Sequence, residues 1–447
     1  MIDANRIAAV MQVPCMINSD MAQQMQLWED LYLNRAGWIK KRVKSRKIPA
    51  NIVRELKRLT LTEFTATIHN APELQAAFLR TTQSLRRKMD FGLAIGGLLL
   101  KPYFTAQGVA VDIVPQDAYL PVNYTDDTCD AIVCPQEIAI GKTYYTRLEY
   151  HVYDRIRQIH TIQNRCFRSS MPGILGTECQ LSDVQIWADI LPAKTFEQVQ
   201  RPLFAIFQAP DSNNIDPASP LGVSVFADAI EFIRDADEQW ERILWELESS
   251  ERAIDATEDL FRYKDGKPDF PKGRERMFRS YEAIDGKSFI NTFSPEVRDT
   301  SYFNAFNQML RRIENAVGLS YGTLSEVSDV EKTAEEVRSS KQRSFSRVKD
   351  IQENLRTALD DLLYGMQYYR DYYANQTNSP VKATFSFGDG VLEDPDVEYQ
   401  RRSQMVRDKI LKPELFLSWY FDCSEDKAKG MMPEQQDDGG LFSGGEI

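Results

Sequence analysis

The sequence is poor in the features that mark membrane, secreted and metal-binding proteins. No apolar run approaches the roughly eighteen residues that a membrane-spanning helix needs. The first residues, MIDANRIAAVMQVPCM, have neither a basic start before an apolar run nor a small-residue cleavage site, so we expect no secretory signal. The cysteines lack CxxC spacing, which favours free thiols over a zinc knuckle or a disulfide framework. They are Cys15, Cys129, Cys134, Cys166, Cys179 and Cys423.

Histidine is also scarce, and acidic residues outnumber basic ones. Only three histidines, His69, His151 and His160, are available for metal binding or acid–base catalysis. The net charge of −12 disfavours a protein that wraps nucleic acid, because binding to phosphates draws its affinity from clustered lysine and arginine. This charge still permits a surface that touches DNA without holding it.

Sequence motifs give no support for an enzyme. The segments GKT at 141–143 and GKS at 286–288 contain only the second half of a phosphate-binding loop. Such a loop needs a glycine five residues before its second glycine, and those positions hold Gln136 and Tyr281. We therefore expect no bound nucleotide, no cofactor, and no catalytic serine elbow, zinc-protease helix or dinucleotide loop.

Adjacent carboxylates leave one enzymatic alternative open. Two clusters could hold divalent metal ions for a metal-dependent nuclease. They are Asp126, Asp127 and Asp130, and the pair Asp360 and Asp361. In a chain with 66 acidic residues, neighbouring carboxylates are common, so solvated surface acids are the favoured interpretation.

Hydrophobic periodicity predicts an α+β protein. Residues 20–90 carry apolar residues at three- and four-residue spacing, which is typical of helices, and 97–210 are dominated by strand patterns. Helical patterns return at 224–250, 301–317 and 334–373. Because no regular strand–helix–strand alternation is present, α+β is favoured over α/β.

The segment 224–250 combines one apolar stripe with a strongly acidic remainder. The stripe is Phe226, Ile230, Ile233, Trp240, Leu244 and Leu247. Against Arg234 and Arg242, the other faces carry Asp228, Glu231, Asp235, Asp237, Glu238, Glu241, Glu246, Glu248 and Glu251. Neighbouring like charges weaken an isolated helix by roughly a few tenths of a kcal/mol per pair, so this face is not tuned for helix stability alone. The simpler interpretation is a solvated face of an acidic protein.

Segments of different chemistry flank the remaining helices. Residues 251–300 are irregular and locally basic, and they include the strand-like run KSFINTFSPEV. Residues 318–333, GLSYGTLSEVSDVEKT, are small, polar and acidic, and lie between two helical runs. After residue 373 the pattern indicates a strand and two short helices, and then a polar tail that is expected to be mobile.

The order of these parts resembles the portal proteins of tailed bacteriophages. The likeness covers roughly residues 20–420, and three segments carry most of it: KPYFTAQGVAVDIVPQDAYLPV, FQAPDSNNIDPASPLGVSVFADAIEFI and IENAVGLSYGTLSEVSDVEKTAEEVRSSKQRSFSRV. Portal proteins form rings of about twelve copies at one capsid vertex, with wing, stem, clip and crown domains around an axial DNA channel. The resemblance therefore implies a structural protein that is not an enzyme.

The resemblance also implies a portal-type fold with long stem and wing helices, a small α/β clip and a small helical crown. Its parts would be an N-terminal region with a strand-rich wing (1–221), stem helices (222–250 and 301–317), a clip (251–300), a tunnel loop (318–333), a long wing helix (334–373), a crown-like region (374–432) and a mobile tail (433–447).

Three groups of residues receive roles from this resemblance. The DNA-facing tunnel loop would present Ser320, Tyr321, Thr323, Ser325, Glu326, Ser328, Asp329, Glu331 and Lys332. The acidic channel face of the stem would be Glu231, Asp235, Glu238, Glu241 and Glu248. The clip would dock partners through Lys264, Lys267, Lys272, Arg274 and Arg276.

The implied function is the passage of double-stranded DNA during packaging and ejection. The implied partners are other copies of this chain, the terminase large subunit, a head–tail adaptor, the major capsid protein and any scaffolding protein. The protein would be assembled in the host cytoplasm and located at the capsid vertex of the virion. A metal-dependent phage nuclease, or another virion scaffold or adaptor protein, remains the alternative.

An acidic channel has a physical rationale. Each phosphate that a basic residue neutralises adds a contact that must be broken at every step of DNA movement. Acidic side chains avoid this grip, and a flexible loop of small polar residues at the narrowest point would do the same.

Overall fold

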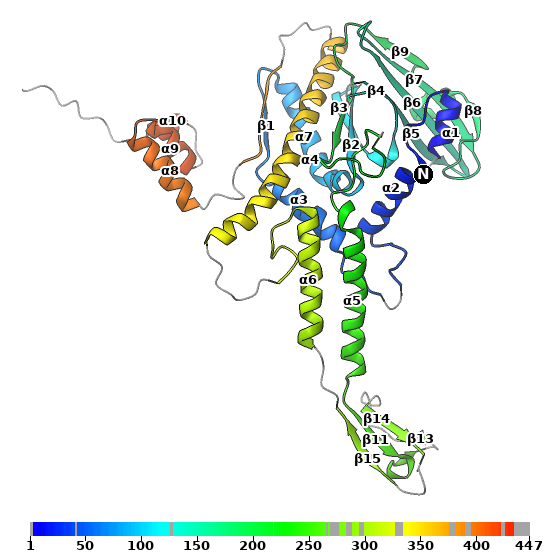
Figure 1. The fold of residues 1–447 in the computed structure, drawn as a ribbon. Coiled ribbons are helices and arrows are strands. Elements are labelled where there is room, and N and C mark those ends of the chain that lie inside the picture. Colours follow the sequence, from blue (N-terminus) through cyan, green and yellow to red (C-terminus); the bar gives the residue numbers. More distant parts are fainter. Residues whose placement is uncertain are drawn as a thin grey trace, which may run out of the picture. The chain divides into compact units, whose positions relative to one another are not determined.

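The computed structural model describes residues 3–40, 43–125, 128–217, 219–264, 267–268, 277–282, 288–294, 299–326, 334–374, 381–388, 395–421 and 425–432. Contacts divide the chain into two units, Met1–Gly388 and Asp389–Ile447. Helices and antiparallel sheets are both extensive, which confirms the predicted α+β class (Figure 1). Among the described residues, no helix is long and apolar enough to cross a bilayer.

Seven α-helices are described in the first unit and three in the second. The first seven are α1 (Ala4–Met11), α2 (Ser19–Tyr32), α3 (Ile48–Leu61), α4 (Pro72–Ile95), α5 (Ile230–Ser249), α6 (Asp299–Val317) and α7 (Ala334–Ala374). The others are α8 (Pro395–Arg407), α9 (Pro413–Tyr420) and α10 (Glu425–Lys429).

The strands of the first unit form one large sheet and several small ones. The large antiparallel sheet has the order β4 (Leu120–Thr125), β5 (Thr128–Ile140), β6 (Thr143–Asp154), β7 (Ile159–Ser169) and β8 (Thr177–Cys179), and β9 (Ala193–Phe196) also pairs with β7. A second sheet has the order β10 (Ala205–Gln208), β2 (Gly97–Thr105) and β3 (Gly108–Pro115). Strand β1 (Thr65–Ile68) pairs with β16 (Ala383–Ser386). Residues 383–386 therefore belong to the first unit, although the sequence grouped them with the C-terminal region.

Helices α4 and α7 cover the sheet β10–β2–β3 and bury most of the core (Figure 1). Buried side chains recur on α7 at three- and four-residue intervals, at Val348, Ile351, Leu355, Leu359, Leu362 and Met366. This spacing puts them on one face of a helix, which explains why a single long helix forms here. Helix α4 ends where Gly96 takes a φ of 102°, a left-handed conformation that glycine adopts readily.

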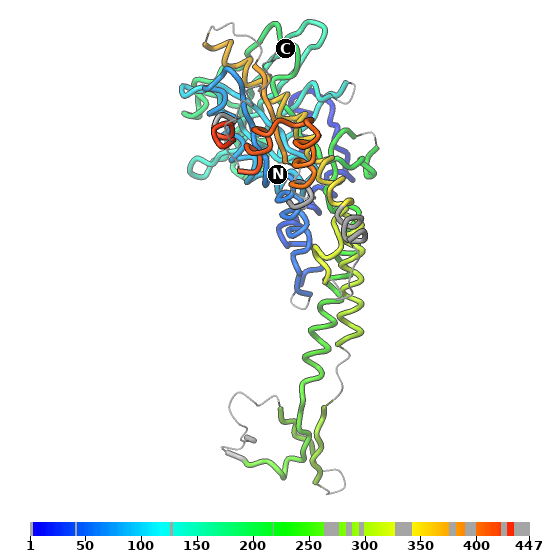
Figure 2. The backbone as a smooth tube through the Cα atoms, turned by 90° about the vertical axis from the view of Figure 1, so that its left-hand side faces the viewer, coloured from blue at the N-terminus to red at the C-terminus, as the bar shows by residue number. Residues whose placement is uncertain are grey.

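Helices α5 and α6 pack against each other and run away from this core (Figure 2). Helix α5 begins at Ile230, after a 3-10 turn at Ala227–Ala229. The expected helical start at 222 is instead a non-helical stretch in which Val223, Val225 and Phe226 are buried. Because these apolar residues pack against the core, the helix begins later in the chain than the sequence predicted.

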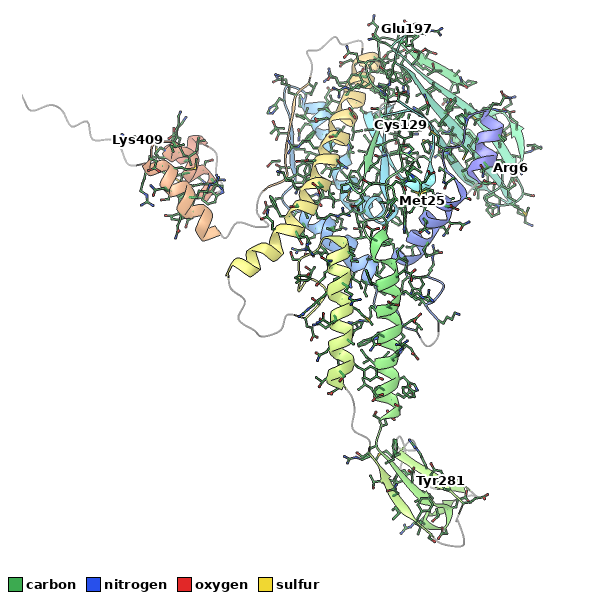
Figure 3. The ribbon with its side chains drawn as sticks, in the orientation of Figure 1. Arg6, Met25, Cys129, Glu197, Tyr281 and Lys409 are labelled. Carbon is green, nitrogen blue, oxygen red and sulfur yellow. The ribbon has the colours of Figure 1, made fainter. Side chains whose placement is uncertain are left out.

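Short strands follow α5 in the chain. They are β11 (Ala253–Thr257), β14 (Phe278–Tyr281) and β15 (Ile290–Phe293) in one sheet, and β12 (Tyr263–Lys264) with β13 (Lys267–Pro268) in another. Strand β11 is parallel to β14 and antiparallel to β15. Tyr281 (Figure 3) and Ile290 are exposed on this small sheet.

One buried glutamine fixes the point from which α5 departs. The side chain of Gln116 donates to the carbonyl oxygens of Ile95 (3.0 Å) and Gly222 (2.8 Å), and it accepts the N–H of Gly222 (3.1 Å). The backbones of Gly96 and Gly222 approach so closely that a Cβ on Gly222 would lie 2.1 Å from the Gly96 oxygen. The PLGVS segment is thus held against the end of α4.

The contact at Gly222 gives a test of this junction. We expect Gly222→Ala to lower the free energy of unfolding by about 2 kcal/mol or more, because the new methyl group meets backbone that cannot move aside. Gly37→Ala is the matched control, since nothing lies within 4 Å of a Cβ there. Urea unfolding of the two variants measures the difference, and equal stabilities would contradict the proposed role of the junction.

Candidate functional site

An apolar seam joins α5 to α6. Ile233, Ala236 and Ile243 are buried on α5, and Phe306 and Ile313 are buried on α6. The rings of Trp240 and Phe306 lie 5.5 Å apart between centroids. Each helix therefore uses one face for its partner and leaves the other available to solvent or to another molecule.

The residues expected to form the acidic channel face lie outside this seam. Glu231, Asp235 and Glu248 are exposed, and Glu238 and Glu241 are half-buried. Arg234 Nε pairs with Glu238 Oε1 at 3.2 Å on this side of the helix. The exposed side of α5 is therefore mainly acidic, and Trp245 (57% exposed) and Leu247 (45% exposed) are also accessible in its C-terminal half.

Two acids that the sequence placed on this solvated side are buried instead. Asp237 accepts hydrogen bonds from the indole of Trp38 (3.1 Å) and the backbone N–H of Arg46 (3.0 Å), and burial raises the pKa of its carboxyl group. Glu246 is also buried. Removing these two from the nine acids leaves seven against two arginines, a net charge of −5 rather than −7 on the accessible faces.

A buried carboxylate organises the start of the loop that follows α6. Glu314 is fully buried, and its Oε1 accepts the backbone N–H groups of Gly322 (3.1 Å), Leu324 (2.6 Å) and Ser325 (2.8 Å). The Ser325 hydroxyl donates to its Oε2 at 2.8 Å. Four hydrogen bonds to one buried carboxyl group hold residues 322–325 in a single conformation.

The described tunnel-loop residues are consequently less free than their composition indicated. Ser320 bonds to Ser344 through its backbone N–H (2.6 Å) and its hydroxyl (2.7 Å). Thr323 is exposed and donates back to the Ser320 carbonyl at 2.7 Å, and Tyr321 is 45% exposed. Glu326 is exposed, and its backbone N–H donates to Asn307 Oδ1 at 2.8 Å.

The remaining expected tunnel-loop and clip residues lie largely outside the described part of the chain. These are Ser328, Asp329, Glu331 and Lys332 of the loop, and Lys272, Arg274 and Arg276 of the clip. Lys264 and Lys267 are described as backbone only, and they are paired directly across the β12–β13 hairpin.

Residues 318–322 spell GLSYG, a GxSxG spacing that the expectation of no serine elbow overlooked. A nucleophile elbow places its serine on a sharp turn between a strand and a helix, beside a histidine. Here the serine follows α6, and its hydroxyl bonds to another serine, Ser344. The chain's histidines at 69, 151 and 160 lie in other elements, so this segment is a loop anchor rather than a catalytic turn.

His151 and His160 meet in a buried hydrogen-bond chain. The N–H of Leu203 donates to His160 Nδ1 (3.4 Å), so His160 Nε2 donates to His151 Nδ1 (3.1 Å) and His151 Nε2 donates to Glu149 Oε1 (2.9 Å). Burial lowers the pKa of both imidazoles. Burial opposes ionisation of Glu149, but the charge of Lys101 at 2.6 Å, the hydrogen bond from His151 and the charge of Arg147 together outweigh burial and hold the pKa of Glu149 well below its usual range. The two neutral imidazoles therefore link β6, which carries Glu149 and His151, to β7, which carries His160.

The candidate metal-binding acids do not form a site in the described residues. Asp130 is buried, and both of its oxygens accept hydrogen bonds from Arg155 Nε, at 2.8 and 3.0 Å. Asp126 and Asp127 lie outside the described residues. Within the part of the chain that the structure describes, no group of three or more His, Cys, Asp and Glu side chains is placed to hold a metal ion.

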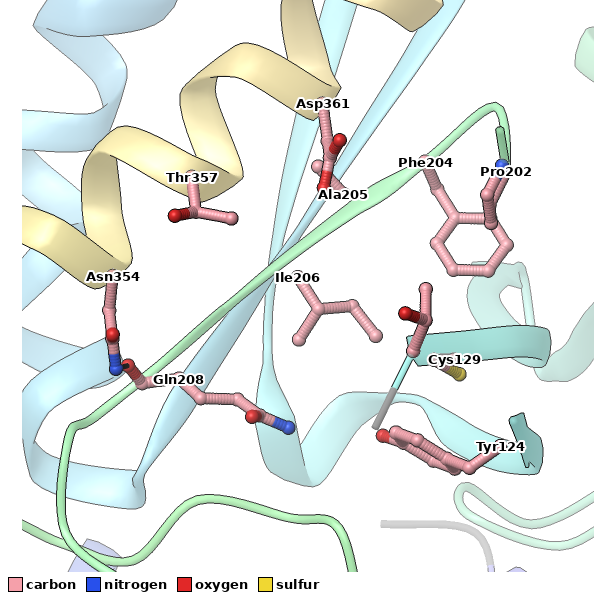
Figure 4. Close-up of a pocket in the computed structure, with 11 residues that line it drawn as sticks. Tyr124, Cys129, Pro202, Phe204, Ala205, Ile206, Gln208, Asn354, Thr357 and Asp361 are labelled. Atoms are coloured by element: carbon pink, nitrogen blue, oxygen red, sulfur yellow. Dashed lines mark hydrogen bonds between the residues drawn. The ribbon is translucent and has the colours of Figure 1, made fainter. Parts of the chain in front are cut away.

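A cavity of about 250 Å³ lies between α7, β10 and the β4–β5 hairpin (Figure 4). On one side Asn354 donates to the Gln208 carbonyl at 3.1 Å, and Asp361 pairs with Arg201 at 3.0 Å. On the other side burial raises the pKa of the Cys129 thiol to about 12. A thiol with that pKa stays protonated near neutrality, so Cys129 is a poor nucleophile.

A second cavity of about 250 Å³ lies between α1, α2 and Asp117. Burial, together with the charge of Glu29, raises the pKa of Asp117 to about 6. The folded protein therefore keeps the proton of this side chain up to about pH 6, whereas the unfolded chain loses it near pH 4.

Comparisons with known proteins give a distant likeness among solved structures. No family model matches the sequence, and no curated protein matches it. Among solved structures, a chain from the neck of a native GTA particle computed with C12 symmetry is similar, with a TM-score of 0.47 and 9% identity. The match covers 92% of this chain and 95% of that chain. A likeness of this degree does not identify the family of this chain.

The Glu314 anchor predicts a local loss of order on neutralisation. We expect Glu314→Gln to lower the free energy of unfolding by about 2 kcal/mol, because the amide has one acceptor oxygen where the two carboxyl oxygens accept four hydrogen bonds. Amide hydrogen exchange at residues 322–325 should also become faster. Glu326→Gln, an exposed acid in the same loop, is the control, and the same exchange rates in both variants would contradict the anchor.

The raised pKa of Asp117 predicts how the stability of the fold changes with pH. Because its folded pKa is raised, the folded state keeps a proton that the unfolded state loses above about pH 4, and stability falls as the pH rises through about 6. Asp117→Asn should therefore stabilise the protein by up to about 3 kcal/mol at pH 7.5, and the gain should vanish below about pH 4. Unfolding at both pH values measures this, with the exposed Asp20→Asn as control. A gain independent of pH would contradict the assignment.

Proposed function

We propose that this protein assembles into a portal-like ring, of about twelve copies, that lets double-stranded DNA pass through a central channel at one vertex of a virus capsid. The observation that carries the proposal is the division of α5 into a buried seam and an acidic exposed face. Glu231, Asp235 and Glu248 on that face would line the channel, with Glu238 and Glu241 beside them.

The charge of this face suits passage rather than binding. A duplex that meets carboxylates forms no ion pairs, so its movement breaks none. The buried seam supports the same arrangement, because packing against α6 leaves Glu231, Asp235 and Glu248 of α5 exposed. A basic lining would instead hold the duplex by releasing its counterions.

The anchored loop supports a defined constriction. Glu314 and Ser344 fix residues 320–325, so in a ring these segments would form a collar of set diameter. Tyr321 and Glu326, which are exposed, would be the described side chains nearest to DNA. This refines the expectation of a freely flexing loop, at least for its first half.

The partner roles follow from the resemblance. The clip at 251–300 would dock the terminase large subunit during packaging and a head–tail adaptor afterwards, and the wing would contact the major capsid protein and any scaffolding protein. The energy for movement would come from the terminase, since this chain has no phosphate-binding loop. The protein would be assembled in the host cytoplasm and remain in the virion.

The assembly itself is the first test. Mass photometry and negative-stain images of the purified chain should show rings of about a dozen copies with a central hole. A monomer that cleaves DNA when divalent metal is added would favour the nuclease alternative. A non-annular assembly would favour a different virion scaffold.

A second test addresses the acidic face. We expect rings of the variant Glu231→Lys/Asp235→Lys to bind double-stranded DNA at least about tenfold more tightly than wild type near 0.15 M salt, with affinity that falls steeply as salt rises. Asp189→Lys/Glu197→Lys, which reverses two exposed acids outside the helical pair, is the matched control. DNA binding by filter retention measures both, and equal effects would count against a channel location.

A further inference from the structure

Two cysteines lie directly opposite each other on neighbouring strands. Cys166 on β7 pairs in register with Cys179 on the edge strand β8, and their sulfur atoms are 3.0 Å apart. Directly opposed residues of antiparallel strands have Cβ atoms about 4.5–5.5 Å apart, slightly more than a disulfide requires. A small shift of β8, which is three residues long and has a neighbour on one side only, would bring the sulfurs to bonding distance.

The other described cysteines have different surroundings. The thiol of Cys15 donates to the Ile17 carbonyl, and that of Cys129 donates to the Ala131 carbonyl, each at 3.4 Å. Cys134 is buried, and burial raises the pKa of its thiol to about 12. Within the described residues, the facing sulfurs of Cys166 and Cys179 therefore form the one thiol–thiol contact.

We propose that Cys166 and Cys179 form a reversible disulfide that staples β8 to β7. The sequence indicated free thiols throughout, because the spacing of these two shows no motif. Their partnership arises from the register of the two strands, which composition and spacing do not reveal.

The oxidant required is a small-molecule disulfide such as oxidised glutathione. Cys179 is half-buried and Cys166 is 1% exposed, so Cys179 is the thiol that reacts first. Its thiolate attacks one sulfur of the oxidant and releases one glutathione thiol, and Cys166, after losing its proton to solvent, attacks the Cys179 sulfur and releases the second. The protein loses two protons and two electrons, and one oxidised glutathione becomes two reduced molecules.

Strand β8 and the turn before it hold the N-terminal helix. Arg165 on β7 makes a bidentate pair with Glu178 (2.8 and 2.7 Å), and its Nη1 donates to the Val10 carbonyl of α1 (2.6 Å). Arg6 on α1 (Figure 3) donates to the Leu175 carbonyl at 2.7 Å. A covalent link across β7 and β8 would therefore restrain both the 170–179 turn and the helix attached to it.

The environment would decide the state of this bond. Cytoplasmic thiol buffers keep such pairs reduced, whereas an extracellular medium permits the disulfide. The timing rests on the proposed function: the pair would be reduced while the ring assembles and oxidised in the released particle. The bond itself does not depend on ring formation.

The test is peptide mapping of the full chain. Protein purified with reductant is incubated with oxidised glutathione under native conditions, alkylated, digested without reduction and analysed by mass spectrometry. We expect a linked peptide pair containing Cys166 and Cys179, two hydrogen atoms lighter than the free peptides together. Cys129→Ser should leave the link unchanged, and Cys166→Ser should leave a single glutathione on Cys179.

Hydrogen exchange supplies a readout that needs no variant. Oxidation of wild type should slow amide exchange of residues 170–179 by at least about tenfold, and that of α1 in parallel, because the link restricts local opening. The proposal is overturned if residues 166 and 179 stay reduced in the folded chain while the urea-unfolded chain oxidises, or if either cysteine links elsewhere. Because mapping works on any oligomeric state, an absent ring would refute the proposed function and leave this result standing.

Discussion

The apolar seam between α5 and α6 is the interaction on which the distribution of charge in this protein depends. Ile233, Ile243 and Phe306 bury one side of the pair. Of the α5 carboxylates, Glu231, Asp235 and Glu248 lie on the exposed side, whereas Asp237 and Glu246 are buried. A helix of this composition would be poorly stable alone, because its like charges repel. Packing against α6 offsets the repulsion between these like charges. The acidic face is therefore available for a role unrelated to folding.

Two buried polar side chains hold the ends of this pair. Gln116 ties the segment before α5 to the end of α4, and Glu314 gathers the backbone of the loop after α6. Both satisfy several backbone groups at once, which makes them costly to replace and gives each junction one conformation. The helices therefore leave the core in a fixed direction, and the loop that returns to α7 starts from a fixed base.

The fold class and the long helices follow from periodicity, whereas the roles of single polar residues do not. Val348 to Met366 repeat every three or four residues, so α7 is evident in the sequence, and the strands between 97 and 208 show alternation. Asp237 and Glu246 have the same chemistry as their exposed neighbours, and burial alone separates them. The sequence did indicate that Glu314 is buried, because this acid lies four residues after Leu310 and so falls within the apolar stripe of α6. The contact between Cys166 and Cys179 depends on strand register, which no local pattern encodes.

The direction in which the acidic face points decides whether charge repulsion governs DNA passage. A cryo-electron microscopy map of the assembled chain would locate α5 and its side chains directly. We expect Glu231, Asp235 and Glu248 to line the central channel of a ring. If these carboxylates lay on the outer surface while lysines and arginines lined the channel, transport by a non-gripping acidic wall would be contradicted, even with the ring confirmed.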